Sequence, residues 1–161
     1  GLTGIRTAEV YLNRAEVYIH KYIESGKDEY REKSLATLNY LRSCRYDTRN
    51  VEYTPVNFSN GEDLLNFYKD ERRRELCFES QRWFDLRRYA VCVKYPESKE
   101  IDHVSYLPAT AANANGIPNG TYRLKRYEEE RAYVLPIPGY EIVFNRGELV
   151  DNPEREDREA I

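Results

Sequence analysis

The chain has 161 residues and a formal net charge of -3, because 28 acidic side chains outnumber 25 Lys and Arg. This length suits one domain with a hydrophobic core of its own, and the charge balance, with no basic run free of acids, argues against a nucleic-acid-binding surface. No apolar run approaches the roughly 20 residues that span a bilayer, and the first residues lack the pattern of a signal peptide.

Aromatic residues make up 13% of the chain and include 15 tyrosines. Such a composition suits either the stacking of flat ligands such as sugars or the packing of polar-tipped rings in a helical array, and packing is favoured by count alone. The three cysteines, Cys44, Cys77 and Cys92, have neither metal-ligand nor CxxC spacing. We expect them to be small buried apolar groups.

Two helices are expected at the start of the chain. The first begins between Thr3 and Thr7 and runs to Ser25, where Gly26 supplies a left-handed end, and the second covers residues 28–46. So short a connection predicts an antiparallel hairpin near the length of a tetratricopeptide unit, although only one clear copy is present. Because one repeat cannot cover its own faces, either a third helix covers it or further repeats belong to a preceding part.

A capping-box pattern at residues 59–62 predicts the start of a third helix, which Ser80 is expected to bend and which continues to Ala90. One face of this helix carries Arg72 and Glu79 together with apolar residues: Leu65, Tyr68, Leu76, Trp83, Leu86 and Ala90. Charged groups on a core-facing stripe are unfavourable unless they are paired.

We therefore expect an ion-pair clamp formed by Arg72, Glu75, Glu79 and Arg82, which fixes the register of the helices. In this interpretation three pairs of residues three apart meet along the helix: Arg72 with Glu75, Glu71 with Arg74, and Glu79 with Arg82. A catalytic alternative is that Glu75 and Glu79 form a glycosidase-like acid pair. Catalytic carboxylates need a cleft between them, which neighbours on one packed helix rarely provide, so the structural interpretation is favoured.

The two histidines, His20 and His103, lie in no arrangement with nucleophile or metal-ligand spacing. An enzyme is therefore the least favoured class, and neither a cofactor nor a metal is expected.

Residues 91–122 lose the helical pattern and are rich in Pro, Gly, Asn, Ser and Thr. We expect a long irregular loop or insertion, and little or no β-sheet in the chain. Long ordered loops often carry function, so Tyr95, Tyr106 and Tyr122 are candidate residues for stacking on a ligand. Beyond this loop, Pro136 restricts a short extended run to a sheet edge or to no sheet, and Pro138 opens one more turn of helix.

Four segments, in the same order, resemble motifs of the SusD/RagB family of outer-membrane nutrient-binding lipoproteins. They are IRTAEVYLNRAEVYIH at residues 5–20, SLATLNYLRSCRY at 34–46, ERRRELCFESQRWFDLRRY at 71–89 and YVLPIPGYEIVFNRGELVDNP at 133–153. The third segment is the most specific, and it departs from the family at Ser80, where glycine or asparagine is more usual.

The resemblance implies a mostly α fold, a SusD-like superhelix of helix pairs, with residues 1–161 forming a C-terminal SusD/RagB-like domain. The signal peptide, the lipobox cysteine and most of the tetratricopeptide-like N-terminal region of the family are expected to lie outside this chain. The resemblance implies no catalysis, and it places Arg72, Glu75, Glu79 and Arg82 at motif positions that serve the architecture.

The same resemblance implies a lipid-anchored protein on the extracellular face of the outer membrane. Such a protein caps a SusC-like TonB-dependent barrel transporter and delivers oligosaccharide or peptide nutrients to it. The alternative for this chain is a helical interaction scaffold that docks a membrane partner while the ligand site lies elsewhere.

Overall fold

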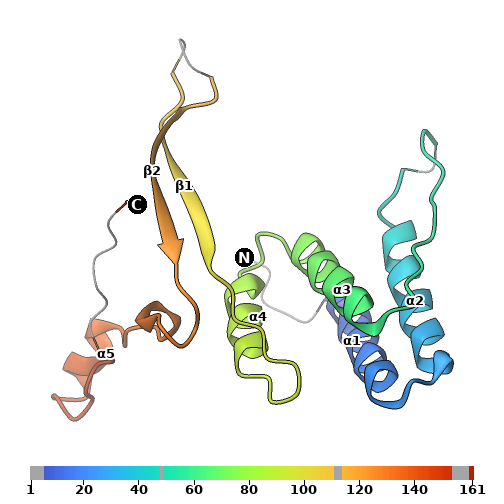
Figure 1. The fold of residues 1–161 in the computed structure, drawn as a ribbon. Coiled ribbons are helices and arrows are strands. Elements are labelled where there is room, and N and C mark those ends of the chain that lie inside the picture. The colour runs from blue at the N-terminus through green and yellow to red at the C-terminus, as the bar shows by residue number, and fades with distance from the viewer. Residues whose placement is uncertain (1–5, 48, 111–113, 154–159) are drawn as a thin grey trace. The chain divides into compact units, whose positions relative to one another are not determined.

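The computed structural model describes residues 6–47, 49–110, 114–153 and 160–161. Within them the chain is mostly helical, with one small two-stranded sheet (Figure 1), which confirms the predicted mostly α class. The chain divides into two compact units, Gly1–Arg82 and Trp83–Ile161, and each is described by itself.

The first unit begins with a helical hairpin made of α1 (Thr7–Ser25) and α2 (Asp28–Ser43). The predicted end of α1 is confirmed, because Gly26 has a φ of 67° and its N–H donates to the carbonyl of Tyr22 at 2.8 Å. The other limit expected for its start, Thr3, lies outside the described residues. Fully buried side chains of both helices form the core: Leu12, Ala15, Ile19 and Leu38.

The third helix, α3 (Gly61–Glu75), packs against α1. Its N-cap is Asn60 and not the predicted Ser59, because the Asn60 side chain accepts hydrogen bonds from the backbone N–H groups of Glu62 and Asp63 at 2.8 and 3.1 Å. A Cβ at position 61 would lie 2.6 Å from Cγ1 of Ile23. Glycine is therefore required where the start of α3 meets α1.

A turn at residues 76–80 separates α3 from α4 (Gln81–Ala90), at the place where a bend was predicted. Phe78 and Ser80 adopt left-handed backbone conformations there, with φ values of 63° and 61°. Glycine and asparagine tolerate this region better than serine does. The backbone at Ser80 is therefore strained.

The prediction for the cysteines is wrong at two of three positions. Cys44 and Cys77 are exposed and Cys92 is half-buried, and all three are free thiols. Cys44 caps the C-terminus of α2 and Cys77 lies in the turn after α3. Both cysteines therefore lie just after the end of a helix and not on the apolar helix face on which burial was expected.

The second unit has a small aromatic and aliphatic core. Leu86 of α4, Leu124 and Tyr133 are buried together, and Trp83 and Tyr127 pack against them. The Trp83 ring stacks on Tyr133 with centroids 4.8 Å apart. This core joins α4 to the strand and the short helix that follow it in sequence.

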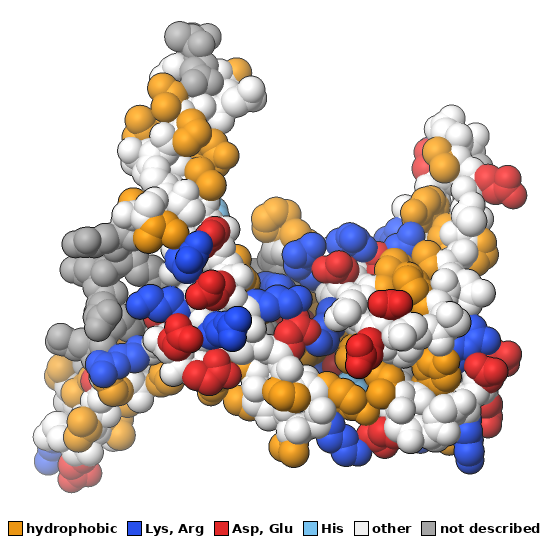
Figure 2. Space-filling view, viewed as in Figure 1, with side chains coloured by type: hydrophobic (Ala, Val, Ile, Leu, Met, Phe, Trp, Pro, Cys, Tyr) orange, Lys and Arg blue, Asp and Glu red, His pale blue; other side chains and the backbone are white. Residues whose placement is uncertain are grey.

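Part of the expected loop at residues 91–122 is an antiparallel hairpin of β1 (Ile101–Leu107) and β2 (Ile117–Leu124). The register shifts between Val104 and Tyr106, where β2 carries one extra residue near Gly120, whose φ is 106°. Figure 2 shows hydrophobic side chains along this hairpin, in agreement with the exposure of Leu107 and Ile117. The two strands were not predicted from the sequence.

The C-terminal motif folds back on itself through hydrogen bonds between side chains and the backbone. After a short 3-10 helix at Arg131–Tyr133, the backbone N–H of Ile137 donates to Oδ1 of Asp151 at 2.8 Å, and Nδ2 of Asn152 donates to the carbonyl of Leu135 at 2.7 Å. Between these contacts lies α5 (Gly139–Phe144), the predicted extra turn of helix. Asp151 and Asn152, near the end of the motif, thus anchor the proline-containing segment at its beginning.

Candidate ligand-binding site

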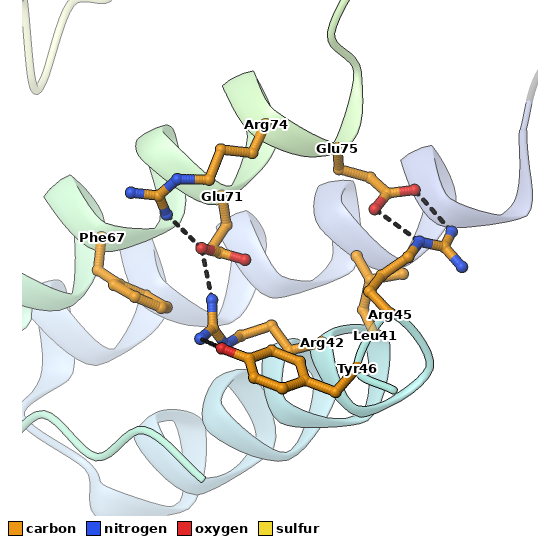
Figure 3. A pocket seen from close by; sticks show the side chains of 8 residues that line it. All are labelled: Leu41, Arg42, Arg45, Tyr46, Phe67, Glu71, Arg74 and Glu75. Carbon is orange, nitrogen blue, oxygen red and sulfur yellow. Dashed lines mark hydrogen bonds and ion pairs between the residues drawn. The ribbon is translucent and has the colours of Figure 1, made fainter. Parts of the chain in front are cut away.

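A pocket of about 610 Å³ lies in the first unit, against the C-terminal end of α2 and the second half of α3 (Figure 3). Its size falls within the range of small-molecule sites in proteins. Three arginines and two glutamates line it together with apolar and aromatic groups: Leu41, Arg42, Arg45, Tyr46, Phe67, Glu71, Arg74 and Glu75.

Arg42 crosses the pocket from α2 to α3. Its Nη1 lies 2.6 Å from Oε1 of Glu71, and its Nη2 donates to the hydroxyl of Tyr46 at 3.1 Å. The guanidinium also lies 5.2 Å from the ring centroid of Phe67 and 5.6 Å from that of Tyr46, within the range of cation–π contacts. Arg74 is a second partner of Glu71, one turn away on α3.

Glu75 is paired with two arginines that lie just outside helices, Arg45 after α2 and Arg6 before α1. Arg45 donates through Nε and Nη2 to both carboxylate oxygens, at 3.0 and 2.7 Å, and Nη2 of Arg6 donates to Oε1 at 2.9 Å. The hydrogen bonds from Arg45 lower the pKa of Glu75 below its usual value, and the nearby charge of Arg6 acts in the same direction. The carboxylate is therefore ionised at neutral pH.

The four residues of the expected clamp have different surroundings. Arg72 is buried, with Nη1 donating to Oδ1 of Asn13 at 2.9 Å and Nη2 3.8 Å from Glu9. Glu79 pairs with Arg6, whereas Arg82 makes no ion pair within the described part of the chain.

The local pairs that we expected for Glu75 and Glu79 are thus replaced by pairs with arginines that are distant in sequence, Arg45 and Arg6. Among the expected local pairs, the one between Glu71 and Arg74 is present.

The loop tyrosines all lie in the second unit and do not share one surface. Tyr122 is paired with His103 across the hairpin, and Tyr106 with Pro118. His103 and Tyr106 are three residues apart on β1 and therefore point to opposite faces of the hairpin. Because Tyr122 is paired with His103 and shares its face, Tyr122 and Tyr106 also point to opposite faces. Tyr95, which is half-buried, precedes β1. Tyr106 is the most open of the three and is 56% exposed.

Sequence reasoning missed the α2 side of the pocket. The signal was present in two patterns: two arginines three residues apart at the end of one helix, Arg42 and Arg45, and two glutamates four apart on another, Glu71 and Glu75. Each pair repels internally but complements the other. Pairing them requires knowing that the two helices lie beside each other.

The described residues contain no group of His, Cys, Asp and Glu that could hold a metal ion. None of their helices has both the length and the apolar content needed to cross a membrane.

Comparisons with known proteins identify the family. The SusD-like protein P2 of Formosa agariphila is 30% identical over 152 residues, which cover 92% of this chain and 25% of that protein. The chain thus spans about a quarter of the length of this curated relative. No solved structure gives a significant match. A sequence model of the SusD family matches residues 2–154, nearly the whole chain, and the chain therefore belongs to the SusD family.

Proposed function

We propose that this chain is part of a nutrient-binding component of an outer-membrane uptake system. The protein would act on the extracellular face, attached by a lipid outside this chain. It would cap a SusC-like TonB-dependent transporter and pass oligosaccharides or peptides to it. Membership of the SusD family carries this proposal.

We further propose that the chain binds its ligand without catalysis. The two acids of the catalytic alternative support this, because Glu75 and Glu79 are both paired with arginines. A catalytic acid needs a proton to give at neutral pH, whereas the neighbouring Arg45 favours the ionised form of Glu75.

On the second unit, Tyr106 is the best of the three tyrosines for contact with a sugar ring. Its side chain is 56% exposed, on a strand that holds its position. Tyr95 and Tyr122 are half-buried and would contribute less.

Calorimetric titration of the 161-residue protein against a panel of oligosaccharides and a panel of peptides tests the proposal. We expect saturable binding of at least one ligand and weaker binding by Tyr106→Ala, while Tyr140→Ala, which replaces another exposed tyrosine in α5, leaves the affinity unchanged. Absence of binding to every member of both panels would contradict it.

The exposed apolar side chains of the β1–β2 hairpin favour a second candidate, a scaffold that docks a protein partner. Leu107 and Ile117 are paired across the hairpin and are 46% and 52% exposed. If scaffolding is the role of this chain, co-purification with the transporter persists in Tyr106→Ala and is lost when Leu107 and Ile117 are both changed to Ser.

A further inference from the structure

The pocket between α2 and α3 contains a buried N–H group without an acceptor. Nε of Arg42 is inaccessible to solvent and has no hydrogen-bond partner, although both terminal nitrogens of the same guanidinium are satisfied by Glu71 and Tyr46. Because Nε is inaccessible to water, a ligand cannot reach it either, and Arg42 contributes to the pocket mainly through its positive charge.

The charges around the pocket also leave positive charge in excess. Glu71 is shared by Arg42 and Arg74, and Glu75 is shared by Arg45 and Arg6, so each carboxylate already faces two guanidinium groups. Arg6 also pairs with Glu79 and does not line the pocket. The pocket lining itself contains three arginines and only two glutamates. A ligand with one negative charge would balance this surplus.

Arg74 is the arginine best placed to receive such a ligand. Its side chain is 58% exposed, and its one ion pair in the described part of the chain uses Nη1 alone. Nε and Nη2 therefore remain as donors, and a guanidinium edge of this kind matches the two oxygens of a carboxylate.

The remaining lining suits hydroxyl groups. Glu71 and Glu75 can accept hydrogen bonds, the arginines can donate them, and a sugar hydroxyl does both. Phe67 and Tyr46 add aromatic surface against which the apolar face of a ring can pack. A compact polyol that carries one carboxylate satisfies the acceptors, the donors and the charge at once.

We infer that the α2–α3 pocket binds a uronic acid residue of an acidic glycan, with the sugar carboxylate held by Arg74. The choice of a glycan rests on the proposed function, whereas the negative charge follows from the pocket itself. This places a ligand site on the first unit, separate from the tyrosines of the hairpin.

Calorimetric titration at low ionic strength with short oligomers of galacturonate, glucuronate and mannuronate tests the inference. Each oligomer is compared with its methyl ester, which keeps the sugar rings and removes the charge. We expect at least one uronate to bind and its methyl ester to bind at least about tenfold more weakly. Added NaCl should weaken the binding of the acid.

Arg74→Gln and Arg73→Gln form a matched pair of variants. Both positions lie on α3 and are similarly exposed, at 58% and 53%, but Arg73 pairs with Asp70 and does not line the pocket. Arg74→Gln should weaken uronate binding about tenfold, and Arg73→Gln should leave it within about twofold. Far-UV circular dichroism checks that both variants retain the helical fold.

Three results would overturn the inference: no uronate binds, the ester binds as well as the acid, or both variants lose affinity equally. A neutral oligosaccharide that binds while every uronate fails would refute the uronate site and leave the proposed function standing. Failure of all ligands, neutral and acidic, would refute both.

Discussion

Replacing Arg72 by methionine tests whether the buried arginine of α3 stabilises the first unit. Arg72 is 5% exposed and lies one turn from Tyr68 and one turn from Leu76, both of which are also buried. Methionine keeps an unbranched apolar stem but removes the guanidinium, and with it the hydrogen bond to Asn13 and the charge near Glu9.

The expected loss can be worked from these contacts. A hydrogen bond from a charged donor contributes about 1.5–3 kcal/mol, and breaking a fully buried ion pair costs about 3–5 kcal/mol. The side chain of Glu9 is 23% exposed and its distance to Arg72 is 3.8 Å, so water can replace much of that pair. The methionine side chain buries some apolar surface and so offsets part of this loss. We therefore expect the free energy of unfolding to fall by about 2 kcal/mol.

Urea unfolding followed by far-UV circular dichroism measures this loss. Arg73→Met is the control, because Arg73 is the next residue on α3, is 53% exposed and makes only a surface pair with Asp70. We expect the control to change the free energy of unfolding by less than about 0.5 kcal/mol. If Arg72→Met is as stable as the unchanged protein, or if both variants lose the same stability, Arg72 does not stabilise the first unit through its buried contacts.

Three other changes have expected outcomes. Ser80→Gly relieves the left-handed backbone of the α3–α4 turn and should raise stability by about 0.5–1 kcal/mol in urea unfolding; a lower stability would contradict the strain. Glu75→Gln should be destabilising at neutral pH, because Arg45 lowers the folded pKa of Glu75. This difference should shrink as pH falls below about 4.5 through that lowered pKa, and a difference that stays constant as the pH falls would contradict the origin assigned to it. Arg123→Gln, which breaks the exposed pair with Asp102, should leave the urea midpoint unchanged, and a clear shift would show that this pair does more than a surface contact.

The helices and their ends were readable from the sequence because their signals are local. Gly26 ends α1 as predicted, and the apolar stripe of α3 is buried where the period of 3.6 placed it. The N-cap of α3 was missed by one residue because Ser59 and Asn60 are both good caps and only the fold selects between them.

The features that were missed depend on contacts between distant residues. The hairpin strands contain Pro118 and Gly120, which indicate loops, and their pairing joins residues 10 to 23 positions apart. The partners of Glu75 lie 30 and 69 residues away on Arg45 and Arg6, so helical spacing alone suggested nearer ones.

We propose that this chain contributes a ligand-binding surface to a SusD-type protein. Titration of the isotope-labelled protein with oligosaccharides, followed by two-dimensional amide NMR, tests it most directly. We predict saturable shifts confined to amides around Glu71 and Glu75, around Tyr106, or around both. A spectrum that stays unchanged with every oligosaccharide, in a protein shown to be folded by the same spectrum, would contradict the claim.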